Sequence, residues 1–191
     1  MSDTDPKTAS PFDTLADAAE RYGTLSLENY SRVRSLAEAI SNGFCRYLGG
    51  KPEARCCYLV PPEGAWTPQD HQSGAFSVSG QHFLPLAPIR FGLGVRVSRN
   101  GDWMRVVLIA AANGTVMDIH IEGGKTYSFE TPRNDAVMQA FFAHLVQHLV
   151  DWFDDQSRRY EHGEYGGGGG IGFDFLEREE AAKAPPAPEA P

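Results

Sequence analysis

The sequence predicts an α+β fold, a two-layer sandwich in which an antiparallel meander sheet of five to six strands carries N- and C-terminal helices on one face. Two observations predict this class. On both sides of a central region, apolar residues recur at spacings of three and four, as in helices with one buried face. Within that region, three turn dipeptides separate segments in which apolar and polar residues alternate: Asn100-Gly101, Asn113-Gly114 and Gly123-Gly124.

The N-terminal part is predicted to form two helices. Ser10 and Pro11 are typical of an N-cap and a first helical position, and Gly23 is expected to stop this first helix, so it spans 11–22. Ser26 opens a longer helix that ends at Gly49-Gly50. The apolar stripe of that second helix consists of Leu27, Tyr30, Val33, Ala37, Ile40, Phe44 and Leu48.

A strand is predicted over 55–60, followed by a 61–75 loop that is longer than most connections in compact domains. Because Asn-Gly accepts positive φ at both turn positions, the meander should have tight two-residue turns. Its strands are then 89–99, 102–112, 115–122 and 125–131. After Thr131-Pro132, a last helix to about 160 carries the stripe Met138, Phe141, Phe142, Leu145, Leu149, Trp152 and Phe153.

Two-residue turns also fix the register, because the residues that flank a turn pair with each other and share a face. One face is then apolar and forms the core: Ile89, Phe91, Leu93, Val95, Val97, Met104, Val106, Leu108, Ala110, Met117, Ile119 and Ile121. The second face is mixed. Its predicted rows are Arg96, Arg105, Glu122 and Lys125, then Gly94, Val107, His120 and Tyr127, then Gly92, Ile109, Asp118 and Phe129, with Arg90 and Trp103 toward the ends.

Gly92 and Gly94 should leave a shallow trough on this second face, bordered by aromatic and arginine side chains. Three occupants are open: the protein's own helix or long loop, another protein, or a small ligand or nucleic acid. Aromatic residues and arginine are enriched in protein interfaces. The candidate binding residues on the sheet are therefore Arg90, Arg96, Trp103, Arg105, Tyr127 and Phe129.

Acid–base chemistry has only weak candidates. Asp118, His120 and Glu122 project to the second face, but Glu122 should pair with Arg105 and Lys125, and His120 should lie opposite Tyr127. The 61–75 loop adds His71, so the candidate catalytic residues are His120, Asp118, Tyr127 and His71. No serine or cysteine has a base close in sequence, and the sequence predicts no cofactor.

Metal binding has a single weak candidate pair in the sequence. His144 and His148 are spaced four residues apart on the last helix and could chelate one ion, although a solvated polar stripe explains them as well. Cys56 and Cys57 are neighbours on a predicted strand, so their side chains should point to opposite faces and cannot share a metal. With Cys45 on the apolar side of its helix, packing is the expected role of all three thiols.

Charge and composition predict ordered and disordered parts. The net charge is −8, but residues 21–160 carry 13 acids and 14 bases, so the acidity belongs to the ends. We expect disorder over 1–10, a single domain over 11–162, and a disordered tail over 163–191 that begins with five glycines. A short apolar motif at 171–177 could dock on another protein through Phe173, Phe175 and Leu176.

These features favour a non-enzymatic protein-binding or adaptor module that uses the mixed sheet face and the tethered C-terminal motif, with another protein as partner and a possible homodimer. One alternative is a small-ligand-binding protein or enzyme with its site between the 61–75 loop and the sheet face. Nucleic-acid binding through the arginine-bearing face is least favoured, because the net charge is −8. The cysteine usage and the absence of an apolar span predict a cytoplasmic protein without membrane contact.

Overall fold

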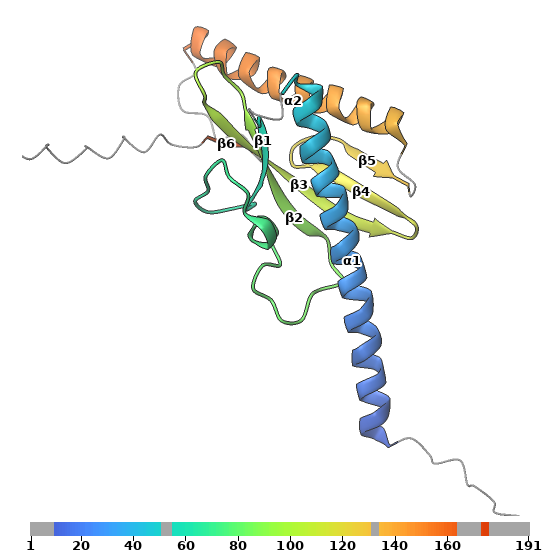
Figure 1. Cartoon of the computed structure of the whole chain (residues 1–191). Coiled ribbons are helices and arrows are strands. Elements are labelled where there is room, and N and C mark those ends of the chain that lie inside the picture. Colours follow the sequence, from blue (N-terminus) through green and yellow to red (C-terminus); the bar gives the residue numbers. More distant parts are fainter. Residues whose placement is uncertain (1–9, 51–54, 131–133, 164–172, 176–191) are drawn as a thin grey trace, which may run out of the picture.

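The computed structural model describes residues 10–50, 55–130, 134–163 and 173–175. It contains α1 (Pro11–Tyr47), β1 (Cys57–Val60), the short 3-10 helix η1 (Gln72–Ala75), β2 (Ile89–Arg96), β3 (Trp103–Asn113), β4 (Val116–Ile121), β5 (Thr126–Phe129), α2 (Asp135–Glu161) and β6 (Phe173–Phe175). The sheet order is β1-β2-β3-β4-β5, with every pair antiparallel, and β6 pairs with β3. The predicted α+β meander is therefore confirmed, with α1 and α2 lying across the sheet (Figure 1).

The N-terminal region forms one continuous helix of 37 residues, so the predicted stop at Gly23 is wrong. Ser10 and Asp13 form a reciprocal capping box, with N···O distances of 2.9 and 3.1 Å, and Pro11 begins the helix. A glycine inside a helix costs only about 1 kcal/mol relative to alanine. The cap and the packing of the C-terminal half of α1 are sufficient to offset that cost.

The core lies between the helices and the apolar sheet face. All twelve residues predicted for that face are in the core cluster or packed against it. The helices meet where Phe142 of α2 packs against Phe44, with ring centroids 5.7 Å apart. A Cβ atom at Gly43 would lie 2.6 Å from the Phe142 ring, so a larger residue at 43 would require that ring to shift.

The first two hairpins keep the predicted faces but not the predicted partners. Arg96 pairs with Trp103 instead of Arg105, because the Val97 amide bonds to the Asp102 carbonyl and four residues, not two, form the turn. In the next hairpin Asn113 pairs with Val116, which moves the turn one residue along. Each change shifts the register by two residues, so the side chains stay on the predicted side.

The third hairpin is different, because its register is shifted by one residue. The Ile121 amide donates to the Lys125 carbonyl at 3.1 Å, so three residues, 122–124, form the turn. Ile119 consequently pairs with Tyr127, and Met117 pairs with Phe129. A one-residue change moves every side chain of the strand to the other face. Tyr127 and Phe129 therefore face the core, and their predicted place on the second face is wrong.

None of the helices in the described ranges carries an apolar stretch long enough to cross a lipid bilayer.

Candidate functional site

The glycine trough on the second face of the sheet is filled by the loop that follows β1. A Cβ atom at Gly94 would lie 2.8 Å from the Trp66 ring, and one at Gly92 would lie 2.7 Å from the Val60 carbonyl oxygen. Trp66 itself is buried, with 5% of its surface exposed. Of the three occupants that the sequence left open, the structure therefore places the protein's own loop in the trough.

Arg105 holds this loop in place. Its Nη1 donates to the carbonyl oxygens of Pro61 at 3.0 Å and Gly64 at 2.9 Å, and its guanidinium lies 5.9 Å from the Trp66 ring centroid. The residue is 6% exposed. The expected ion pair of Arg105 with Glu122 is wrong, because the register shift moves Glu122 away from that row. Arg105 is a structural residue and presents no surface to a partner.

Three of the predicted binding residues remain accessible on this face. Arg90 lies between two acids, with nitrogen–oxygen distances of 3.8 Å to both Glu63 and Glu122. Arg96 is exposed and donates to two carbonyl groups of the following turn. Trp103 is half-buried against Tyr58, with ring centroids 5.6 Å apart. Arg90 lies near one end of β2, whereas Arg96 and Trp103 pair at its other end, so the three residues do not form the continuous surface that the sequence predicted.

The candidate catalytic residues do not converge. His120 Nδ1 lies 3.1 Å from the Thr126 hydroxyl, and Asp118 accepts hydrogen bonds from Asn113 and Ser128. Two strands separate β4, which carries both residues, from β1 and the loop with His71. There His71 Nε2 bonds to the Thr67 carbonyl at 2.9 Å, while Tyr127 faces the opposite side of the sheet. No nucleophile–base pair is assembled from these four residues.

The aromatic and basic residues proposed for nucleic-acid binding are likewise split. Phe129 is 3% exposed and packs edge-on against Phe141 in the core. Arg105 lies under the loop, as described above. Arg90, Arg96 and Trp103 are thus the members of that proposed surface that a nucleic acid could reach.

The C-terminal motif lies partly outside the described residues. Phe173 and Phe175 belong to β6, which pairs antiparallel with residues 104–106 of β3 and lies within the range, 163–191, for which the sequence predicts a disordered tail. Leu176 lies outside the described residues, as do 1–9, 164–172 and the rest of the tail. β6 occupies the side of β3 that β4 leaves open, because β4 pairs only with residues 108–113.

His144 and His148 are not a solvated stripe, since both are half-buried between α2 and the last hairpin. Their rings stack 6.1 Å apart, and His144 also packs 5.5 Å from Tyr127. Among the described residues, no third ligand gathers near them. Burial is the main cause that lowers the pKa of both imidazoles, with Lys125 adding to the effect at His144 and His144 adding to it at His148.

These lowered pKa values predict a stability change near neutral pH. The unfolded chain regains the ordinary histidine pKa of 6.5 and binds more protons than the folded chain as the pH falls through that value. The free energy of unfolding should therefore decrease between about pH 7.5 and pH 5.5. Urea denaturation across this range measures it. The double variant His144→Asn, His148→Asn should lose much of this slope, and an unchanged slope would contradict the assignment.

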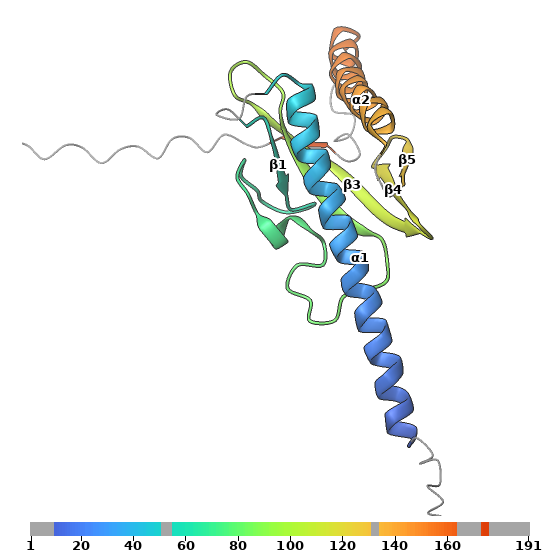
Figure 2. The same cartoon turned by 45° about the vertical axis from the view of Figure 1, so that its right-hand side comes forward.

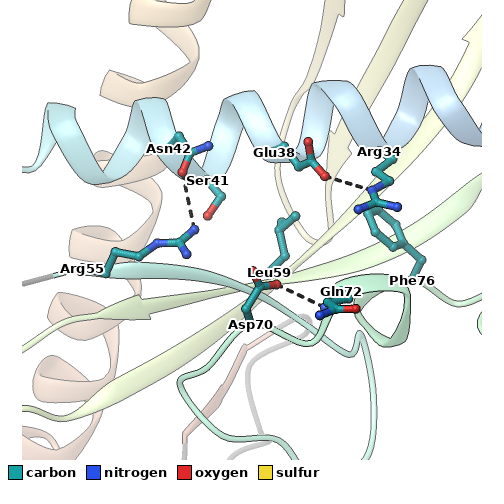
Figure 3. A pocket seen from close by; sticks show the side chains of 9 residues that line it. All are labelled: Arg34, Glu38, Ser41, Asn42, Arg55, Leu59, Asp70, Gln72 and Phe76. Carbon is teal, nitrogen blue, oxygen red and sulfur yellow. Dashed lines mark hydrogen bonds and ion pairs between the residues drawn. The ribbon is translucent and has the colours of Figure 1, made fainter. Parts of the chain in front are cut away.

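A polar pocket of about 300 Å³ lies between α1 and the segments around β1 and η1. Figure 3 shows its side chains, with Arg34 paired to Glu38 at 2.9 Å and Arg55 bonded to Asn42 at 3.4 Å. The Ser41 hydroxyl is buried and has no hydrogen-bond partner among the described residues. The pocket lies on the helix side of β1, not between the loop and the second sheet face as the sequence suggested.

An exposed apolar surface lies at the start of α1 and was not predicted from the sequence. Residues 11–25, here called the arm, extend beyond the sheet in both views (Figures 1 and 2). Phe12 is 74% exposed and Leu15 is 67% exposed. Tyr22 anchors the base of the arm by stacking on Phe83 at 4.9 Å. The sequence did contain a signal for the arm, because apolar residues continue at helical spacing across Gly23. The predicted helix end at Gly23 divided that pattern into two helices.

The second missed feature is a group of three thiols. The sulfur atoms of Cys45, Cys56 and Cys57 all lie within 4.8 Å of one another. The expectation that Cys56 and Cys57 point to opposite faces is wrong, because β1 begins at Cys57 and strand alternation does not constrain Cys56. Burial raises the pKa of Cys56 to about 11 and also raises the pKa of Cys57, so both are protonated thiols in the isolated protein.

Comparisons with protein-family models, with curated proteins and with solved structures found no match to this chain.

Proposed function

We propose that this chain is a non-enzymatic protein-binding module that assembles as a homodimer through the arm. The observation that supports this proposal most strongly is an apolar stripe on the arm whose first two side chains, Phe12 and Leu15, are exposed. Phe12, Leu15, Ala19 and Tyr22 continue, at spacings of three and four, the same helix face that Val33, Leu36 and Ile40 bury in the core. One face of α1 is thus covered by the sheet over its C-terminal half, whereas on the arm Tyr22 stacks on Phe83 and no described residue covers Phe12 or Leu15.

Two physical arguments support a partner for this surface. A helical segment of about 15 residues is marginally stable in water without packing contacts. Moreover, covering a leucine or phenylalanine side chain contributes about 1.5–3 kcal/mol relative to leaving it exposed. A partner on the stripe would stabilise the arm and remove the two most exposed apolar side chains of the arm, Phe12 and Leu15, from water.

The charge pattern favours a second copy of this chain as that partner. Ala16, Ala19 and Gly23 lie beside the large side chains of the stripe, so a second helix can approach closely. The acids of the arm, Asp13, Asp17 and Glu20, project away from it. Two identical arms can therefore pack without placing like charges against each other, although the protein as a whole carries a net charge of −8.

Sedimentation velocity of the full chain and two variants tests this proposal. Wild type should sediment as a dimer at micromolar concentration, and Leu15→Glu should sediment as a monomer, because it places a charge in the centre of the interface. Arg21→Glu adds an acid on the opposite side of the same arm and should remain dimeric. A wild-type monomer, or equal dissociation of both variants, would contradict the arm as the dimer interface.

In this proposal the adaptor role belongs to the C-terminal motif, and each dimer would present two copies of it. The pairing of β6 with β3 supports a strand-addition mode, in which main-chain hydrogen bonds provide affinity. A partner segment would compete with residues 173–175 for the open side of β3. The three neighbouring thiols are compatible with a reducing compartment, and we propose the cytoplasm.

A small-ligand-binding protein is the second candidate. The buried Ser41 hydroxyl, which lacks a hydrogen-bond partner among the described residues, favours a polar ligand in the pocket of Figure 3. Arg34 and Arg55 suit a carboxylate, although each already has a partner. Ligand binding would appear as a rise in melting temperature that Ser41→Ala abolishes, whereas dimer formation would be unaffected by that substitution.

A further inference from the structure

The three thiols lie where the end of α1 meets the start of β1. Cys45 is in the last turn of the helix, Cys56 directly precedes β1, and Cys57 is its first residue. Cys45 and Cys57 are buried, and Cys56 is half-buried. Each sulfur lies within 4.8 Å of the other two, and no histidine, aspartate or glutamate of the described ranges joins them at this distance.

The local backbone holds the sulfurs in this arrangement. The Cys56 amide donates to Cys45 Sγ at 3.0 Å, and the Cys56 thiol lies 3.4 Å from the Cys45 carbonyl oxygen. The Gly50 amide donates to that same carbonyl at 2.8 Å, which turns the chain back over the thiols. An amide hydrogen bond to sulfur stabilises a thiolate more than a neutral thiol, because the thiolate carries the charge.

The main chain at Gly50 packs closely against two of the sulfurs. A Cβ atom at this position would lie 2.5 Å from Cys45 Sγ and 2.6 Å from Cys56 Sγ. Any side chain here would therefore crowd the thiols or displace them. Glycine at this position therefore lets the main chain pack directly against the two sulfurs while they stay close to each other.

We propose that Cys45, Cys56 and Cys57 bind one soft metal cation, Zn²⁺ or Cu⁺, through their three sulfurs. Thiolates are the ligands that select these ions. Three sulfurs about 2.3 Å from one ion in a plane lie roughly 4.0 Å apart, so the group needs to contract by less than about 1 Å. On binding, each thiol releases its proton to solvent and no electron is transferred. The carboxyl end of α1, where Cys45 lies, also favours a cation.

The two ions differ in what they require. Cu⁺ is satisfied by three thiolates, whereas tetrahedral Zn²⁺ takes a fourth ligand such as water. The full-length reduced protein would be titrated with Zn²⁺, with Co²⁺ as its spectroscopic probe, and separately with Cu⁺ under anaerobic conditions against a chromogenic competitor. We expect one ion to bind per chain in at least one of the two titrations. If Zn²⁺ is the natural ion, the Co²⁺ titration should also show thiolate-to-metal charge-transfer absorption.

Variants assign the binding to these sulfurs. Cys45→Ser and Cys56→Ser should each weaken affinity by about 100-fold or more, since even the partners of metal ligands contribute 10- to 100-fold. His144→Asn, His148→Asn is the matched control and should bind as wild type does. Cys57 is fully buried in the core, so its substitution tests folding as well as binding and is not used.

A second readout needs no substitution. In the wild-type protein, the bound ion should protect Cys56, the half-buried thiol of the three, from alkylation, as measured by mass spectrometry. The proposal is overturned if excess Zn²⁺ and Cu⁺ both leave alkylation unchanged, or if the bound ion is retained with wild-type affinity in Cys45→Ser and Cys56→Ser. It does not depend on the arm, because the thiols lie at the opposite end of α1.

Discussion

Phe141→Ala should lower the free energy of unfolding by about 3–5 kcal/mol, the usual cost of removing a buried aromatic ring. Phe141 is fully buried and is in contact with Tyr127, Phe129 and Phe142, with ring centroids 5.3 to 6.0 Å apart. Two of these contacts exist only because the three-residue turn at 122–124 rotates β5 toward the core. Urea denaturation followed by circular dichroism measures the loss.

Tyr160→Ala is the matched control on the same helix. Tyr160 is 68% exposed, so its removal should change the free energy of unfolding by less than about 0.5 kcal/mol. A double-mutant cycle of Phe141→Ala with Phe129→Ala should show strong coupling, because the two rings touch. Additive effects in the cycle would indicate that Phe129 faces the other side of the sheet, as two-residue turns would have placed it.

Arg105→Met should lower the free energy of unfolding by about 2–4 kcal/mol, because it removes two hydrogen bonds that a charged and buried guanidinium donates to the carbonyl groups of Pro61 and Gly64. Methionine keeps most of the side-chain volume, so the loss reports hydrogen bonds more than a cavity. We also expect the loop over the trough to detach from the sheet. Increased acrylamide quenching of Trp66 fluorescence, measured in a chain whose other tryptophans are replaced by phenylalanine, checks this.

Arg96→Met is the comparison for that substitution. Arg96 lies on the same sheet face and also donates to two carbonyl groups, but it is exposed and water can replace the lost bonds. The change in the free energy of unfolding should stay below about 1 kcal/mol. Equal effects of Arg96→Met and Arg105→Met would mean that the loop does not bury Arg105.

The sequence predicted helices and strands well where the spacing of the apolar residues and the turn residues between segments indicate the same element. The strands of the meander, the last helix and the apolar face follow from alternation and from turn residues such as Asn113-Gly114. The last hairpin failed because Gly123-Gly124 is compatible with both a two- and a three-residue turn. That difference of one residue was enough to exchange the faces of β5 and with it two predicted binding residues, Tyr127 and Phe129.

The site was harder to predict because its contacts join distant parts of the chain. The sequence left three occupants of the glycine trough open. Only the tertiary fold selects the loop, which places Trp66 over Gly94. The thiol group depends on where β1 begins, and a boundary error of two residues concealed it. The arm was concealed by Gly23, since a glycine within a long helix looks locally like a helix end.

Hydrogen exchange along α1 at two protein concentrations tests the central claim, self-association through the arm, most directly. If two arms pack together, the amides of residues 14–25 should exchange at least about tenfold more slowly in the concentrated sample than after dilution to the monomer. Amides of α2 serve as the internal reference and should not change. Arm exchange that is independent of concentration, in a sample that sedimentation shows to dissociate on dilution, would place the interface elsewhere and contradict the account.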